Sequence, residues 1–146
     1  MQMRKVNKVI IHCTATPEGR DVDFETIKKW HTDKGWRDIG YHYVIGLNGE
    51  IWKGRDLELA GSHCKGHNAD SIGIAYVGGC DKKMKPKDTL NEAQYMSLIR
   101  LISILWKYYK FTIHGHNEFS NKACPSFNVK ERLQEKVILN IEYINY

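Results

Sequence analysis

The sequence predicts one α/β domain in which a central mixed β-sheet is flanked by helices. Three observations predict this class: short apolar runs rich in β-branched residues, segments of helical spacing that alternate with them, and an Asn48-Gly49 pair between two of the runs. At 146 residues, 42% of them hydrophobic, the chain is long enough for one buried core. No repeat or linker divides it, so we take residues 1–146 as a single domain.

The first half of the chain supplies a strand, a helix and a hairpin. Val9 to His12 is a short apolar strand whose last residue emerges at the strand end. Asp23 is a suitable N-cap for a helix of about three turns, which Gly35 would end. Asn48-Gly49 lies between the β-prone runs 41–45 and 50–52, and this arrangement is the strongest short signal for a hairpin.

The second half adds a central strand, a long helix and a further strand and helix. The apolar run 71–77 is rich in β formers, and Thr89 and Glu92 have the spacing of a capping box. The helix after this box is predicted to bury Tyr95, Leu98, Ile99, Ile102, Leu105, Trp106 and Tyr109. A strand at 111–114 and a helix capped by Asn128 follow, whereas the tail 137–146 fits no single pattern.

Charge and composition narrow the choice of partners less than the motifs do. The net charge of +5 and the pI near 9.0 suit an anionic partner, but acidic residues interrupt the Lys and Arg throughout, which is typical of a solvated surface. The N-terminal apolar run has only three residues, Val9 to Ile11. A secretory signal needs roughly 7–15 and a spanning helix roughly 20. We therefore expect synthesis in the cytoplasm and no membrane insertion.

The four cysteines favour reduced thiols over a disulfide framework. They are widely spaced and form no Cys-x-x-Cys pair: Cys13, Cys64, Cys80 and Cys124. Cys13 alternates away from His12 and is predicted to be a small buried hydrophobe. One of the remaining three is free to be a metal ligand.

Histidine and cysteine occur where three of them could hold a catalytic zinc ion. Such a site needs three protein ligands and one open position. His12 at a strand end, a histidine at 114 or 116, and Cys124 satisfy that number. His114 and His116 share strand parity, so the alternation of side chains leaves the choice between them open.

Four blocks of the sequence resemble the zinc-dependent N-acetylmuramoyl-L-alanine amidases of the type 2 group. They are IIHCTAT at 10–16, KKWHTDKGWRDIGYHYVI at 28–45, GSHCKGHNADSIGIAYVGG at 61–79 and HNEFSNKACPSF at 116–127. The resemblance covers roughly residues 8–133 and is strongest to the small phage lysozymes, with peptidoglycan recognition proteins more distant. The resemblance implies the fold that type 2 amidases share with peptidoglycan recognition proteins. It also implies hydrolysis of the amide bond between N-acetylmuramic acid and L-alanine in bacterial peptidoglycan.

The resemblance also implies one catalytic zinc ion with three ligands. The family's ligands fall on His12, His116 and Cys124. The second ligand lies eight positions before the cysteine in this family, which selects His116 and leaves His114 to the strand. Zinc-activated water would then attack the amide carbonyl.

Four further residues match functional positions of the family or lie near them. Tyr41 and Lys122 match the catalytic tyrosine and lysine, which would stabilise the oxyanion formed during attack. His63 matches a histidine that lines the substrate groove. Asn68 is expected either to lie at the rim of that groove or to form a turn, and both reasons account for an asparagine there equally well. Glu118 is either a partner that orients His116 or a surface charge.

Several alternatives stay open at this point. The family includes non-catalytic peptidoglycan-binding modules, which commonly lack the zinc cysteine, and cytosolic recycling amidases, which usually carry an aspartate at that position. Cys124 favours the lytic phage type, which acts on the wall after release through a holin-like pore. Some phage members also inhibit RNA polymerase, which is therefore an alternative partner. The eleven residues before His12 form a shorter arm than theirs, which argues against this second function. We expect a monomer that binds no nucleic acid.

Overall fold

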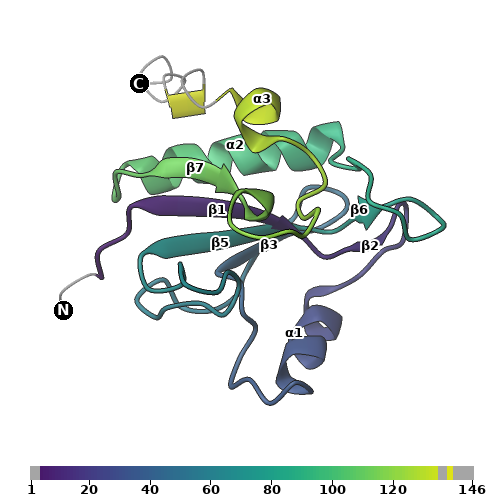
Figure 1. Cartoon of the computed structure of the whole chain (residues 1–146), viewed down its shortest axis with the longest axis horizontal. Helices are drawn as coiled ribbons and strands as arrows, with labels where there is room; N and C mark the ends of the chain where they lie inside the picture. The colour runs from purple at the N-terminus through teal and green to yellow at the C-terminus, as the bar shows by residue number, and fades with distance from the viewer. Residues whose placement is uncertain (1–3, 135–137, 140–146) are drawn as a thin grey trace.

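A five-stranded mixed sheet organises the protein (Figure 1), whose computed structural model describes residues 4–134 and 138–139. The strands of the chain are β1 (Lys8–Cys13), β2 (Thr16–Pro17), β3 (Tyr43–Ile45), β4 (Ile51–Lys53), β5 (Ser71–Tyr76), β6 (Gly79–Cys80) and β7 (Thr112–Gly115). The helices whose bounds lie within the described residues are α1 (Phe24–Thr32), α2 (Glu92–Trp106), α3 (Val129–Leu133) and the short 3-10 helix η1 (His116–Glu118). The predicted α/β class is confirmed.

The order of strands in the sheet is β4-β3-β5-β1-β7. Strand β1 pairs in parallel with both β5 and β7, β3 pairs in parallel with β5, and only β4 is antiparallel to its neighbour. The carboxyl ends of four strands therefore meet at one edge of the sheet, where sites in such sheets form. The two-residue strands β2 and β6, which make a second small sheet, are too short for any sequence period to reveal.

Helices cover both faces of the sheet (Figure 1). Alternate residues of β1 and β5, together with Leu98, Ile102 and Leu105 of α2, form the larger core cluster. A smaller cluster, which includes Ile27 of α1 and Val44 of β3, packs on the other face. The predicted buried face of the long helix is thus confirmed, and His12, which alternates with Ile11, points to the α1 face.

The predicted capping box at Thr89 and Glu92 is wrong. The N-cap of α2 is Asn91, whose side chain accepts a hydrogen bond from the amide of Gln94, while the Gln94 side chain accepts one from the amide of Asn91. Thr89 Oγ1 instead accepts a bond from the amide of Gly79 at 2.7 Å. Because the hydroxyl of Thr89 is engaged by Gly79 of β6, the helix begins two residues later than the predicted box would place it.

Other element boundaries differ little from the prediction. Asp23 caps α1 and Asn128 caps α3 as expected, but α1 ends at Thr32 and Gly35, with a φ of +92°, lies in the turn beyond it. Strand β3 starts at Tyr43, two residues into the predicted run 41–45, and the amide of His42 just before it bonds to the carbonyl of Gly73 in β5. Most of the tail 137–146 lies outside the described residues. Of this tail the structure describes residues 138–139, and Ile138 is buried.

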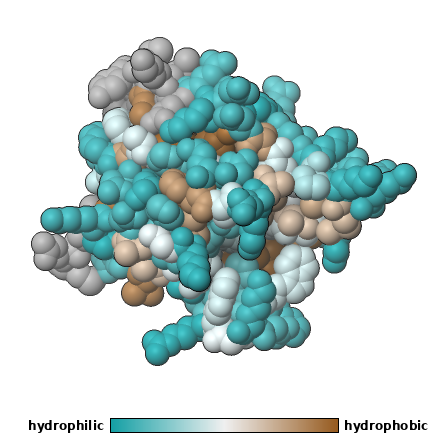
Figure 2. Space-filling view, viewed as in Figure 1, coloured by the Kyte–Doolittle hydropathy of each residue, from teal (hydrophilic) through white to brown (hydrophobic). Residues whose placement is uncertain are grey.

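The surface of the described residues is largely hydrophilic. On the face shown in Figure 2, hydrophilic side chains predominate and apolar ones form small, separate areas. The large apolar side chains that are exposed lie far apart in the chain, and some of them are in turns, such as Leu59, Met84 and Tyr108. No helix within residues 4–134 and 138–139 has the length and apolar character needed to cross a bilayer.

Candidate active site

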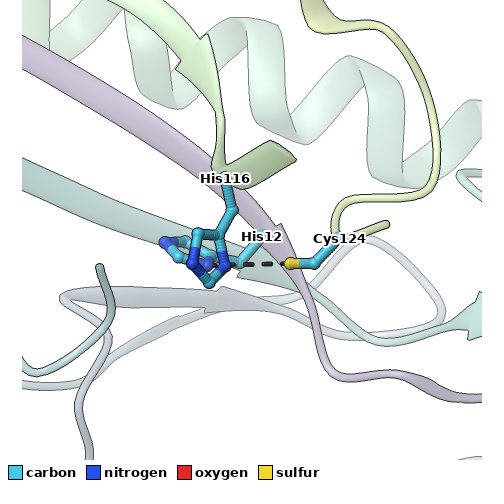
Figure 3. Close-up of side chains that lie close together, drawn as sticks. All are labelled: His12, His116 and Cys124. Atoms are coloured by element: carbon cyan, nitrogen blue, oxygen red, sulfur yellow. Dashed lines mark hydrogen bonds between the residues drawn. The ribbon is translucent and has the colours of Figure 1, made fainter. Parts of the chain in front are cut away.

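Three metal-ligand side chains converge at the carboxyl edge of the sheet. His12 lies near the end of β1, His116 begins η1 directly after β7, and Cys124 lies in the loop that follows. Their ligand atoms all lie within 4.8 Å of one another. Figure 3 shows the two rings and the thiol directed at one another, with His12 Nδ1 at 3.7 Å from Cys124 Sγ. The cluster contains His116 and not His114.

The parallel sheet explains how residues so distant in sequence meet. Strand β1 lies between β5 and β7, so its end and the end of β7 are adjacent. Cys124 is held in place by the amide of Cys13, which donates a hydrogen bond to its sulfur at 3.2 Å. The Cys13 side chain itself is buried in the larger core, as predicted, and all four cysteines are free.

Burial sets the protonation of the cluster. Burial, together with the charges of His63, His116 and Lys122, lowers the pKa of His12 well below its usual value. Burial and the Lys122 charge also lower the pKa of His116. Both rings are therefore neutral at neutral pH and offer a lone pair to a cation. Hydrogen bonding to Cys13 and burial raise the pKa of Cys124, so this thiol keeps its proton until a cation displaces it.

The donor set fits zinc. Two imidazole nitrogens and one thiolate are the ligands that catalytic zinc sites use, whereas calcium and magnesium require oxygen ligands. His12 is 1% exposed, while His116 and Cys124 are partly exposed, so one side of the cluster is accessible. The residues present therefore suit a zinc ion with an open coordination position.

Tyr41 lies beside the cluster with its ring packed between two histidines. Its ring centroid is 5.2 Å from that of His12 and 5.2 Å from that of His31. His31 Nδ1 accepts the amide hydrogen bond of Gly40 at 2.8 Å, which anchors the residue preceding the tyrosine. Burial, with the charges of Cys124 and Cys13, raises the pKa of Tyr41. Its phenol is thus a hydrogen-bond donor and not a base at neutral pH.

A groove of about 620 Å³ opens beside the cluster. It is lined by Trp36, Ser62, His63, Cys64, Lys65, Gly66, Asn68, His116, Phe119, Ser120 and Lys122. Lys122 is exposed, and its charge contributes to the lowered pKa of both His12 and His116. Four residues singled out in the sequence, His63, Asn68, His116 and Lys122, therefore share this groove.

Both ring nitrogens of His63 and the side-chain oxygen of Asn68 are engaged within the chain. His63 Nδ1 lies 2.7 Å from His12 Nε2, and His63 Nε2 lies 3.1 Å from the hydroxyl of Ser71. Asn68 Oδ1 accepts the amide hydrogen bonds of His63 and Cys64, both at 2.9 Å. Sequence reasoning missed Ser71, although a hydroxyl residue at the start of an otherwise apolar strand was a signal.

Glu118 belongs to the end of β7. Its carboxylate pairs with His114 Nδ1 at 2.9 Å and accepts the amide hydrogen bond of Gly115 at 2.7 Å. Among the described residues, the Glu118 carboxylate makes no hydrogen bond to the His116 side chain, so Glu118 does not orient that ring directly. It secures the backbone just before His116 instead.

The chain belongs to the N-acetylmuramoyl-L-alanine amidase family, whose model matches residues 2–127. The endolysin of Escherichia phage T7 is 40% identical over 130 residues, covering 88% of this chain and 86% of that protein. Peptidoglycan-recognition protein SC2 of Drosophila melanogaster is 29% identical over 130 residues, which cover 82% of this chain and 68% of that protein.

A solved structure agrees with these sequence relatives. The N-acetylmuramoyl-L-alanine amidase LysC from Clostridium intestinale URNW matches with a TM-score of 0.78 at 29% identity, over 92% of this chain and 86% of that one. The predicted family, its fold and its relation to the recognition proteins are thereby confirmed.

Proposed function

We propose that this protein is a zinc-dependent amidase that hydrolyses the bond between N-acetylmuramic acid and L-alanine in bacterial peptidoglycan. One observation carries the proposal: the ligand atoms of His12, His116 and Cys124 lie within 4.8 Å of one another beside an open groove. Membership of the amidase family supports the reaction and the substrate class.

His12, His116 and Cys124 would hold the zinc ion. When bound, zinc supplies Lewis-acid chemistry, because it lowers the pKa of water toward about 7 and polarises a carbonyl group. The two histidines would contribute neutral imidazole nitrogens, and Cys124 would contribute its sulfur after the cation displaces the thiol proton. The groove brings the amide of the substrate to the accessible side of the cluster.

Tyr41 and Lys122 stabilise the charge that develops on the carbonyl oxygen. Attack by water turns the amide carbonyl into a tetrahedral oxyanion, and donors directed at that oxygen bind the transition state more tightly than the substrate. The phenol of Tyr41 stays protonated because burial raises its pKa, so it can donate to the oxygen. The exposed ammonium of Lys122 adds a positive charge at the mouth of the site.

Cleavage then separates the peptide from the glycan. Collapse of the tetrahedral oxyanion breaks the carbon–nitrogen bond and expels the amine of L-alanine, which takes up a proton. We infer that His63 and Asn68 contribute to the wall of the substrate groove, and that the protein reaches the wall after release from the cytoplasm, as its likeness to phage endolysins supports.

The test is hydrolysis of purified peptidoglycan by zinc-loaded protein with and without a chelator. We expect new N-terminal L-alanine without new reducing sugar ends, and we expect the chelator to abolish its release. New reducing ends would indicate a glycosidase instead. Tight binding of zinc and peptidoglycan without any cleavage would identify a binding module and contradict the proposal.

A second comparison separates the lytic type from a recycling enzyme. Intact sacculi and soluble muropeptides are offered at equal concentrations of the amide bond. A lytic amidase releases L-alanine termini from the sacculi. Cleavage confined to the soluble fragments would contradict action on the wall.

A further inference from the structure

Three buried polar groups beside the metal cluster are joined in a line. His12 Nε2 lies 2.7 Å from His63 Nδ1, His63 Nε2 lies 3.1 Å from Ser71 Oγ, and Ser71 Oγ donates to the carbonyl of His67 at 2.6 Å. The exposed fractions are 1% for His12, 8% for His63 and 0% for Ser71. Buried polar groups of this kind are rigid only when every donor finds an acceptor.

The chemistry of the two ends fixes the direction of every bond in this line. His12 Nδ1 faces Cys124 Sγ at 3.7 Å, and a nitrogen that binds a cation must carry no proton. The ring proton of His12 is then on Nε2, and it is donated to Nδ1 of His63. A neutral His63 consequently carries its own proton on Nε2 and donates it to Ser71, whose hydroxyl donates to a carbonyl that can only accept.

We propose that His63 and Ser71 are positioning residues for the metal site. Together with the carbonyl of His67 they form an ordered hydrogen-bond chain that holds His12 in the tautomer and orientation that leave Nδ1 free for zinc. This inference rests on the proposed function, and it assigns His63 a role toward His12 in addition to its place in the groove wall. Partners of this kind typically change metal affinity by about 10–100-fold.

Two glycines, Gly61 and Gly73, let the His63 ring lie directly against the backbone. A Cβ atom on Gly73 would lie 2.5 Å from His63 Cγ, and one on Gly61 would lie 2.6 Å from His63 Cδ2. Glycine inside a strand weakens a sheet and often marks a close approach, which explains Gly73 in the middle of β5. Asn68, which lies shortly before β5 and accepts the amide hydrogen bonds of His63 and Cys64, holds the backbone of His63.

The first test needs no substitution. In zinc-loaded protein labelled with ¹⁵N, long-range nitrogen–proton correlations report which ring nitrogen of each histidine carries the proton. We expect protons on Nε2 of both His12 and His63. A proton on Nδ1 of His63 would reverse the chain and overturn the proposal.

The second test compares zinc affinity among variants by competition with a chromophoric chelator. We expect His63→Phe, which keeps a ring without nitrogens, to bind zinc about 10–100-fold more weakly, and Ser71→Ala about tenfold more weakly. His63→Gln can accept from His12 and donate to Ser71, so it should recover part of the affinity. Ser97→Ala is the matched control for Ser71→Ala, because it removes a hydroxyl that donates to the carbonyl of Gly49, outside both the cluster and the groove; its zinc affinity should be unchanged.

The outcomes distinguish this inference from the proposed function. If the unmodified protein binds zinc and both Ser71→Ala and His63→Phe bind it equally well, the positioning role is wrong and His63 serves only the groove. If the unmodified protein binds no zinc, the proposed function itself fails. Ser71→Ala removes a single oxygen and therefore tests the chain even if the ring substitution prevents folding.

Discussion

Individual side chains owe their chemistry here to burial more than to neighbouring charges. Burial is the largest cause of the lowered pKa of His12 and of the raised pKa of Tyr41. The imidazole of His12 is therefore neutral and able to bind a cation, and the phenol of Tyr41 stays protonated and able to donate a hydrogen bond. Lys122 differs because it is exposed, so its cation is available to a substrate.

Replacement of this lysine tests its role directly. Lys122→Ala should lower turnover on peptidoglycan by roughly 10²–10³-fold, because one donor to the oxyanion is lost, while zinc content stays the same. Asn121→Ala, a change at the exposed neighbouring residue, is the control and should keep full turnover. Release of L-alanine termini and metal analysis give the two readouts. Full turnover of Lys122→Ala would exclude this role.

Removal of the thiol should have a different signature. Cys124→Ser replaces a soft sulfur ligand by a hydroxyl, and we expect loss of both turnover and bound zinc. The fold should persist, since Cys124 only borders the larger core. Metal analysis and the circular dichroism spectrum check both points, and a variant that retains zinc would remove Cys124 from the ligand set.

The proposed ligands could be recognised from the sequence, whereas the residues that hold them in place could not. His12, His116 and Cys124 stand in blocks with a characteristic spacing. The amide of Cys13 and the hydroxyl of Ser71 act through strand register and loop geometry, which no spacing records. For the same reason the particular partners of His63 and Asn68 could not be predicted.

At the scale of elements, helix ends show how local patterns compete. Thr89 with Glu92 and Asn91 with Gln94 both fit the form of a capping box, and the structure uses the second pair. Local sequence cannot separate them, because the choice depends on Gly79, which engages Thr89 from another part of the chain. Element type was therefore predictable, while the starting residue of α2 was not.

The two pairs can be separated by measurement. Asn91→Ala should lower the free energy of unfolding by about 1 kcal/mol, because the amide of Gln94 loses its acceptor. Glu92→Ala is the control, since its side chain takes no part in the box and should change stability by about a few tenths of a kcal/mol. Urea unfolding gives both values. A larger effect at Glu92 than at Asn91 would contradict the assigned cap.

At the scale of the whole molecule, the sequence predicted a mixed sheet with helices on its faces but not the order of its strands. Apolar periods reveal each strand separately. The position of β1 between β5 and β7 depends on which faces α1 and α2 cover, and this is a property of the assembled chain. That order is what brings residues 12 and 116 together.

Buried histidines should make stability depend on pH. Burial lowers the pKa of His31 and His42 to about 4 in the folded protein, compared with 6.5 as the ordinary value. The unfolded chain therefore binds protons in this interval and the folded protein does not. Stability is complete above about pH 6.5 and decreases as the pH falls toward about 4. For His42 alone the loss at a pH of about 5 is about 2 kcal/mol.

Urea unfolding at neutral pH and about two pH units lower measures this difference. Chelator is present at both values, so loss of metal does not contribute. The His42 ring, followed by NMR, should not titrate until the pH approaches about 4. Equal unfolding free energies at the two pH values would contradict the prediction.

The parallel pairing of β1 with β7 also determines when the enzyme can first exist. Lys8 pairs with Thr112, so β1 must wait for a strand that is made much later in the chain. Such distant pairing is slow to form, since a long loop must close first. A nascent chain that ends at residue 80 already contains His12 and His63, yet it lacks His116 and Cys124. With the ligand set proposed above, hydrolytic activity therefore cannot arise before residues 116 and 124 have been made and β7 has joined the sheet.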